Sequence, residues 1–289
     1  MTDKMIDANR ALWNEWTRVH ETSEFYDIAA FKAGRETLRP LEIEELGDVT
    51  GKSLLHLQCH FGQDTLSWAR RGAQVTGSDL SDEAIALARA LADELGIDAR
   101  FIAGDIYELP EKLDERFDIV FTSWGVLAWL SDLPRWAQLI ARFLKPGGRF
   151  YIAEIHPFAA MLDREEDGRI VVEDGYLAAS ATGPAGAGST GASDASGAAG
   201  AAVRYEVESS YADASVICEN TVTYQWDHSL GEVVSALAGA GLAIDFLHEW
   251  PFSVHPRSPQ KIQADDGWWY VPGRHDLPLS FSLSAHSPA

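Results

Sequence analysis

The amino-acid sequence predicts an α/β fold in which helices cover both faces of a doubly wound, mostly parallel sheet. Two observations carry this prediction. Short apolar runs of strand length alternate with amphipathic stretches of helix length, and the helical stretches end at glycine or at a Lys-Pro-Gly-Gly turn. Such alternation is typical of parallel strands joined by right-handed helical crossovers, because a parallel connection needs a crossover segment.

Seven strand-like runs build the predicted sheet, at residues 53–57, 74–77, 100–103, 117–122, 150–155, 242–249 and 279–283. Helices are expected between them, at residues 63–71, 82–95, 133–144 and 230–240. The second of these helices has the clearest ends. Ser81 is a suitable N-cap, Asp82 and Glu83 suit the positive end of the helix dipole, and Gly96 ends the helix.

The alternation divides the chain into four segments. Residues 46–156 hold the first five strands, and residues 229–289 complete the sheet. Residues 1–45 have helical periodicity, and residues 157–228 interrupt the alternation. We expect both of these segments to form lids over the carboxyl edge of the sheet, with structural decoration as the alternative for the insertion. Within the insertion, residues 178–202 are almost entirely Ala, Gly, Ser and Thr, which predicts a flexible loop.

The composition excludes several classes of protein. The 289 residues carry 23 basic and 44 acidic side chains, a formal net charge of −21, which disfavours a nucleic-acid partner. Two cysteines provide no disulfide framework, and no apolar stretch reaches the roughly 18 residues that a membrane span requires. The amino-terminal segment lacks the apolar run of a signal peptide. We therefore expect a cytoplasmic enzyme or binding protein without a membrane partner.

Three features predict a ligand at the carboxyl edge of the sheet, where parallel strands meet helix N-termini. The turn at residues 58–62 follows the first strand and presents backbone N–H groups to an anion such as a carboxylate. Asp79 follows the second strand, where its carboxylate can accept hydrogen bonds from ribose hydroxyls. Asp105 follows the third strand, where it can accept a hydrogen bond from an adenine amine. Together these positions suit an adenosine-containing ligand with a carboxylate tail.

Several stretches of the sequence resemble the class I S-adenosylmethionine-dependent methyltransferases. The first two motifs of that family resemble LLHLQCHFGQDTLSWARRGAQVTGSDLS, the third resembles GDIYELP, the fourth FDIVFTSWGVLAWL, and the segment around the fifth strand LKPGGRFYIAE. The resemblance covers residues 45–156, is weaker over 221–250, and suggests a bacterial subgroup through LHLQCHFGQDTLSWAR. It implies a Rossmann-like fold and an enzyme that uses S-adenosylmethionine as cofactor to methylate a small-molecule acceptor.

The resemblance also implies roles for individual residues along the strand ends. Asp79 would hold the ribose, and Leu80 would pack on the adenine. Asp105 would lie at the edge of the adenine and Ile106 against its face. The first turn would pass beneath the methionine portion of the cofactor, through residues Gln58, Cys59, His60 and Gly62.

That turn departs from the family pattern. His56 stands where an acid is usual, Gln58 and His60 stand where glycines are usual, and only Gly62 is retained. Because the acid would normally help to bind the methionine ammonium, we expect Asp64 or carbonyl groups of the turn to take its place. His56 and His60 are not expected to bind a metal ion, since they share one short turn without a clear third ligand.

The acceptor site is expected beyond the fourth and fifth strands. The resemblance places Ser123 and Trp124 near the sulfonium and its methyl group. His156, which follows the fifth strand, is the candidate catalytic base, because a neutral imidazole accepts protons near pH 7. The alternative is that it is only a turn residue before Pro157. Weaker candidates on the lid segments are His20, Tyr26 and His228.

The sequence is also compatible with two other functions. A nicotinamide-dependent oxidoreductase shares the sheet and the acid after the second strand, but its G-x-G-x-x-G fingerprint is missing, since Gly62 is the only glycine of the turn. A protein that binds S-adenosylmethionine without catalysis is the second alternative, because of the departures at His56, Gln58 and His60.

Overall fold

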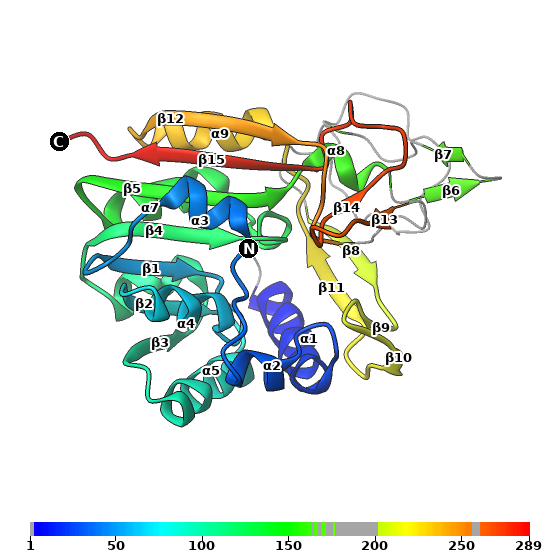
Figure 1. Ribbon diagram of the computed structural model, residues 1–289, viewed down its shortest axis with the longest axis horizontal. Helices are drawn as coiled ribbons and strands as arrows, with labels where there is room; N and C mark the ends of the chain where they lie inside the picture. Colours follow the sequence, from blue (N-terminus) through cyan, green and yellow to red (C-terminus); the bar gives the residue numbers. More distant parts are fainter. Residues whose placement is uncertain (1–2, 163, 167–168, 172–175, 177–201, 256–260) are drawn as a thin grey trace.

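A seven-stranded sheet lies at the centre of the computed structural model, which describes residues 3–162, 164–166, 169–171, 176, 202–255 and 261–289 (Figure 1). The strand order is β12-β15-β5-β4-β1-β2-β3. These strands are β1 (Ser53–Leu57), β2 (Gln74–Asp79), β3 (Ala99–Ala103), β4 (Phe117–Ser123), β5 (Leu144–Ile155), β12 (Ala243–Trp250) and β15 (Ser280–His286). β15 is antiparallel to both of its neighbours, and the other pairs are parallel. The prediction of a mostly parallel, Rossmann-like sheet is therefore confirmed.

The strand order fixes where a ligand can bind. β2 and β3 follow β1 on one side, whereas β4 and β5 lie on its other side. Connections from β1 and β4 therefore leave in opposite directions and open a crevice at the carboxyl ends of these two strands.

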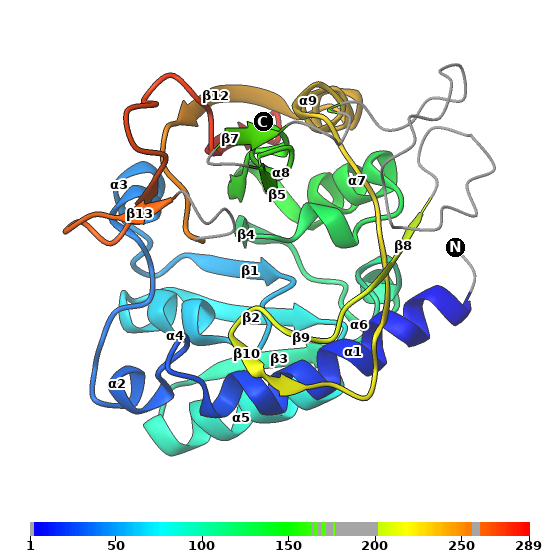
Figure 2. The same cartoon turned by 90° about the vertical axis from the view of Figure 1, so that its right-hand side faces the viewer.

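Helices cover both faces of the sheet (Figure 2). One face packs against α3 (Pro40–Leu46), α4 (Gln63–Arg70) and α5 (Asp82–Leu95), and the other against α6 (Leu109–Lys112), α7 (Leu133–Phe143) and α9 (Leu230–Gly239). Alternation along each strand explains the two layers, because successive side chains point to opposite faces. In β1, Leu54 packs in the first layer with Trp68, and Leu55 in the second with Trp136.

Both predicted ends of α5 are confirmed. The Ser81 hydroxyl accepts a hydrogen bond from the Ala84 N–H at 3.0 Å, and Gly96 ends the helix with a left-handed φ of 64°.

The Lys-Pro-Gly-Gly stop signal at residues 145–148 ends the helix as predicted, because α7 ends at Phe143. β5 begins at Leu144 and includes these four residues, with a register shift against β4 between Leu144 and Arg149. The strand includes them because of a partner distant in sequence: the Gly147 N–H donates to the Ser287 carbonyl at 3.0 Å, and the Ser287 N–H donates to the Gly148 carbonyl at 2.9 Å. The end of the chain thus extends the ladder over a segment whose local sequence favours a turn.

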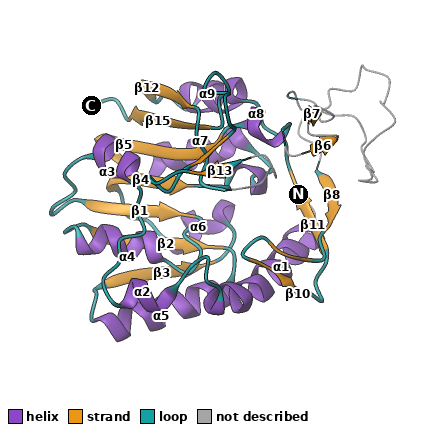
Figure 3. Cartoon of the chain, turned by 45° about the vertical axis from the view of Figure 1, so that its right-hand side comes forward, coloured by secondary structure: helices purple, strands orange, loops and turns teal. Residues whose placement is uncertain are grey.

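The amino-terminal segment and the insertion lie at the carboxyl edge of the sheet (Figures 1 and 3). The former contains α1 (Asp3–Thr22) and α2 (Ile28–Lys32). The described part of the insertion contains α8 (Pro157–Ala160), β6 (Arg164–Glu166), β7 (Arg169–Val171), β8 (Val203–Glu206), β9 (Ser209–Ser210), β10 (Asp213–Ile217) and β11 (Val222–Gln225). β13 (Ile262–Gln263) and β14 (Trp269–Tyr270) form a further hairpin. Of the predicted flexible loop, residues 178–201 lie outside the described residues.

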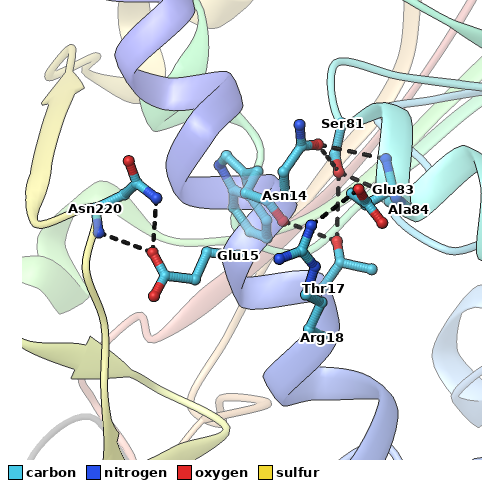
Figure 4. Close-up of polar contacts among 9 residues, drawn as sticks. Asn14, Glu15, Thr17, Arg18, Ser81, Glu83, Ala84 and Asn220 are labelled. Carbon is cyan, nitrogen blue, oxygen red and sulfur yellow. Dashed lines mark hydrogen bonds and ion pairs between the residues drawn. The ribbon is translucent and has the colours of Figure 1, made fainter.

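Polar contacts hold α1 between the sheet domain and the insertion (Figure 4). On one side, the Asn14 Oδ1 accepts a hydrogen bond from the Ser81 hydroxyl at 2.7 Å, at the start of α5. On the other side, the Glu15 carboxylate accepts hydrogen bonds from the Glu219 and Asn220 backbone N–H groups at 2.6 and 2.7 Å. α1 therefore has a fixed position beside the ends of β1 and β2.

Within the described residues, no helix combines the length and the apolar character that a bilayer crossing requires.

Candidate functional site

A cavity of about 790 Å³ opens at the carboxyl edge of the sheet, and a smaller one of about 50 Å³ adjoins it. Gln58, Asp79, Leu80 and Trp129 line both cavities. The larger one is also lined by the predicted cofactor residues Cys59, His60, Gly62, Asp64, Ser123 and Trp124, and the smaller one by Asp105 and Ile106. The structure thus brings together every residue that the sequence predicted for the cofactor.

Asp79 connects the ends of β1 and β2. One carboxylate oxygen accepts the His60 N–H at 2.8 Å, and the other accepts the Ser81 N–H at 2.9 Å. Burial raises the pKa of Asp79 to about 6, although these N–H groups act in the opposite direction. The two oxygens of a carboxylate offer about four acceptor sites, so Asp79 retains acceptor capacity for a ligand in the cavity.

The turn after β1 keeps a glycine-like backbone although two of its residues are not glycine. Gln58 and His60 have left-handed φ angles of 56° and 50°, and Gly62 has φ 79°. For a residue with a side chain this conformation costs about 1–2 kcal/mol. The Gln58 side chain recovers a hydrogen bond, from its Nε2 to the Val126 carbonyl at 3.0 Å. The two departures in sequence therefore leave the path of the turn intact.

His56 cannot supply the missing acid. It is buried, its Nδ1 lies 2.8 Å from the Thr65 hydroxyl, and burial lowers its pKa to about 3. Asp64, on the first turn of α4, lines the cavity as His56 does, and its carboxylate accepts a hydrogen bond from the Ser123 hydroxyl at 3.4 Å. Within the described residues, no group of three or more His, Cys, Asp or Glu side chains is placed to hold a metal ion.

The smaller cavity lies between the ends of β2 and β3. Asp105 accepts the Tyr107 N–H at 2.9 Å, and burial raises its pKa. Ile6 of α1 and Trp129 close this space from outside the sheet. Sequence reasoning missed Ile6, because nothing in its local pattern shows that α1 reaches the end of β3.

An aromatic cluster links the turn after β1 to both lid segments. The His60 Nε2 lies 3.1 Å from the His20 Nδ1, and the His20 Nε2 lies 2.6 Å from the Ser210 hydroxyl. The Tyr26 ring stacks on His60 with centroids 5.3 Å apart. Trp13 contacts His60 edge-on at 5.5 Å. Both histidines are neutral at pH 7, because burial lowers the pKa of His20 to about 3 and that of His60 well below its usual range.

This neutral pair predicts a pH dependence of stability. Below about pH 6.5 the unfolded chain binds a proton at His20 that the folded protein does not bind, so stability falls by up to about 1.4 kcal/mol per pH unit as the pH is lowered. Buried acids with raised pKa values have the opposite effect on the pH dependence of stability. The contribution of His20 is therefore measured by comparing variants with the wild type. In urea denaturation, His20→Gln should lose less stability than the wild type between pH 7 and pH 5. His275→Gln, at an exposed position, should follow the wild type; a parallel fall for His20→Gln would contradict the prediction.

His156 lies outside the residues that line the two cavities. It is buried and caps α8, where its Nδ1 accepts the Phe158 N–H at 3.0 Å, and its Nε2 lies 3.0 Å from the Glu249 carboxylate. This position gives His156 the role of a cap at the turn before Pro157, which was the alternative to a base. His228 also lies outside both linings, with its Nε2 2.6 Å from the Leu130 carbonyl.

Glu154, which sequence reasoning did not single out, shapes the loop after β4. Its buried carboxylate accepts the N–H groups of Gly125, Val126 and Leu127 at 2.5, 2.7 and 3.2 Å. Burial raises the pKa of Glu154, and these backbone bonds oppose the rise. The carboxylate thereby fixes the backbone next to Trp124, whose φ of 51° is also left-handed.

A sheet of this order, with its one reversed strand, defines a Rossmann-like domain, and acids at the ends of β2 and β3 beside a cavity are typical of such domains that bind nucleosides. Comparison with known proteins narrows the class. Residues 54–148 match a family described as a methyltransferase domain. Over these residues the chain is similar to methyltransferase domains, and its fold is that of solved S-adenosylmethionine-dependent methyltransferases.

Individual relatives agree with this family. A ubiquinone biosynthesis O-methyltransferase from Pseudomonas entomophila (strain L48) is 30% identical over 141 residues, which cover 49% of this chain and 57% of that protein. The chain thus spans about half the length of the curated relatives it matches.

Solved structures share the fold. A crystal structure of an S-adenosylmethionine-dependent methyltransferase from Mesorhizobium loti has a TM-score of 0.55 and 21% identity, over 86% of this chain and 96% of that one. The glycopeptide N-methyltransferase MtfA, complexed with S-adenosylmethionine, has a TM-score of 0.51 and 19% identity, over 85% and 90%.

Proposed function

We propose that this chain transfers a methyl group from S-adenosylmethionine to a small-molecule acceptor by in-line displacement. The observation that carries the proposal is one continuous lining, from Asp79 and Leu80 at the end of β2 to Ser123 and Trp124 at the end of β4. A volume of about 790 Å³ falls within the range of roughly 300–1,000 Å³ that is usual for small-molecule sites.

The residues present fit this cofactor. Gln58 Oε1 and Trp124 Nε1, both on cavity-lining side chains, are a buried acceptor and a buried donor without a hydrogen-bond partner. Such atoms are rare in proteins and point to a missing ligand or water. In the proposal, Asp79 binds the ribose, Leu80 and Ile106 contact the adenine, and Asp105 accepts from its amine.

The same proposal assigns the methionine portion of the cofactor to the turn Gln58, Cys59, His60 and Gly62, and its ammonium to Asp64. Ser123 and Trp124 lie near the reacting methyl group.

The protein's part in the reaction is alignment and exclusion of water. When bound, S-adenosylmethionine supplies an already activated methyl carbon, so the acceptor needs only to be held in line with the sulfonium. Glu154 fixes the loop that carries the residues around Trp124. Trp13 and Tyr26 of the amino-terminal lid, together with Trp129 after β4, exclude water from this side of the cavity.

The segments 1–45 and 157–228 act in this proposal as lids, and residues 46–156 with 229–289 as the cofactor-binding sheet. We place the enzyme in a bacterial cytoplasm, because its two cysteines are both free and buried. A net charge of −21 supports a small-molecule acceptor rather than a nucleic acid.

Calorimetry with S-adenosylmethionine, S-adenosylhomocysteine and NADH tests the cofactor. We expect heat with the first two and none with NADH; the reverse would favour an oxidoreductase. Turnover with a library of acceptors then distinguishes an enzyme from a protein that only binds the cofactor. Hydroxyl compounds belong first in this library, because the curated relative is named as an O-methyltransferase.

A further inference from the structure

A buried carboxylate on α3 and a partly buried carboxylate on α4 belong to two helices that border the cavity. Glu42, on α3, is only 1% exposed. Asp64, on α4, lines the cavity, as do Arg39 and Pro40 at the start of α3. α3 lies outside the stretch that matches the methyltransferase family, so no motif predicts this pairing.

Only half of the Glu42 carboxylate has a partner. Its Oε2 accepts the Arg39 backbone N–H at 2.7 Å, which is the glutamate half of a capping box at the start of α3. Its Oε1 is buried and has no hydrogen-bond partner. The Trp124 indole N–H lies near enough to lower the pKa of Glu42, but it does not reach hydrogen-bond geometry. Capping of α3 therefore accounts for the position of Oε2, but not for the burial of Oε1 without a hydrogen-bond donor.

The pair also lacks a countercharge. Within the described residues, neither Glu42 nor Asp64 forms an ion pair with a lysine, arginine or histidine. Arg39 faces both acids but directs its guanidinium to the Gly267 carbonyl at 3.4 Å and over the Trp268 ring. A buried and a partly buried acid without a cation at contact distance are unfavourable unless a proton or a ligand neutralises them.

The pKa values agree with this arrangement. Burial, and then the charge of Asp64, raise the pKa of Glu42 to about 8. Burial also raises the pKa of Asp64, against the Thr37 and Ser123 hydroxyls. Tyr151 of β5 faces Glu42 as well but remains neutral at pH 7, because burial and the two nearby glutamates raise its pKa. At neutral pH the empty pair therefore holds a proton that a bound cation would displace.

We infer that Glu42 and Asp64 together bind the α-ammonium group of S-adenosylmethionine, and that Glu42 takes over the charge of the acid that the family has at position 56. The inference rests on the proposed function. Neutral, buried His56 leaves the ammonium without its usual partner. Asp64 lines the cavity, and Glu42, which is not itself part of the lining, follows the lining residues Arg39 and Pro40 at the start of α3. Entry of the ammonium ionises the pair and releases a proton.

The test is calorimetry with two ligands, S-adenosylhomocysteine and its analogue without the α-amino group. Glu42→Gln keeps an oxygen acceptor for the capping box and removes only the charge. We expect it to weaken binding of S-adenosylhomocysteine about tenfold, the loss of one charged hydrogen bond. It should leave binding of the deamino analogue unchanged. The matched control is Glu44→Gln, an exposed residue on the same helix, which should change neither.

Proton release gives a second readout, from heats measured at pH 7 in buffers of different ionisation enthalpy. The wild type should release a proton on binding S-adenosylhomocysteine, and Glu42→Gln should release much less. Asp64→Asn serves as a second variant. It should also reduce the ratio of the affinity for S-adenosylhomocysteine to the affinity for the deamino analogue.

The outcomes separate the two proposals. If the wild type bound neither S-adenosylmethionine nor S-adenosylhomocysteine, both would fall. If it bound them but Glu42→Gln weakened the two test ligands equally, Glu42 would be only structural and this inference would be wrong. The inference would also be wrong if both variants preferred S-adenosylhomocysteine over the deamino analogue by the same factor as the wild type. Glu42 and Asp64 would then be candidates for binding a cationic acceptor instead.

Discussion

Asp79→Ala is expected to weaken binding of S-adenosylmethionine by about 10- to 150-fold. The substitution removes a charged acceptor of ribose hydroxyls, which is worth roughly 1.5–3 kcal/mol. It also leaves the His60 and Ser81 N–H groups without their acceptor, so the turn after β1 keeps its Cys59–Ser78 backbone hydrogen bond to β2 but loses the one from His60. Calorimetric titration of the wild type and the variant with S-adenosylmethionine measures the effect.

The matched control for this prediction is Asp82→Ala. Asp82 lies three residues away and carries the same charge, but it is exposed on the first turn of α5 and lines neither cavity. Its replacement should change the affinity little. An unchanged dissociation constant for Asp79→Ala would remove Asp79 from the cofactor site and would leave the ribose without its proposed partner.

The parts of the site that could be predicted from the sequence are those fixed by local patterns. The end of a strand and the start of the next helix are both marked in the sequence, so Asp79 and Asp105 could be placed at the carboxyl edge before the structure was known. Parallel strands then bring their ends to one edge. This is why the structure brings all the predicted cofactor residues to the two cavities.

The parts that could not be predicted depend on contacts between distant segments. His20 meets His60 across 40 residues and Ser210 across 190, and no local pattern encodes either meeting. The cap formed by His156 also depends on a distant segment: a histidine after β5 can face the cavity or cap the next helix, and here its Nε2 lies 3.0 Å from the Glu249 carboxylate of β12. The antiparallel direction of β15 likewise follows from its pairing with β5 and β12.

Gly62→Ala is expected to destabilise the protein by roughly 2–5 kcal/mol. A Cβ at Gly62 would lie 2.7 Å from the Phe101 ring and 3.1 Å from Ala88, and the φ of 79° is unfavourable for alanine. The left-handed conformation costs about 1–2 kcal/mol, and overpacking a filled core typically costs about 1–3 kcal/mol. Urea denaturation of the two proteins, at pH 7 and without cofactor, measures the difference.

Gly96→Ala separates the two contributions. Gly96 has a left-handed φ of 64° but nothing within 4 Å of an added Cβ, so only the backbone cost of about 1–2 kcal/mol should appear. Equal losses in the two variants would mean that Phe101 moves aside freely, and the packing argument would then fail.

The same comparison explains which glycine of the turn the sequence retains. Gln58 and His60 have φ angles like that of Gly62, yet both carry side chains, because these side chains border the cavity rather than the core. At Gly62 the backbone instead passes against Phe101 of β3, under the first turn of α4. The turn tolerates a side chain on a residue with a left-handed φ when that side chain borders the cavity. It does not tolerate one where the added Cβ would also clash with core side chains. Glycine is therefore required only at the position where the chain packs against the core.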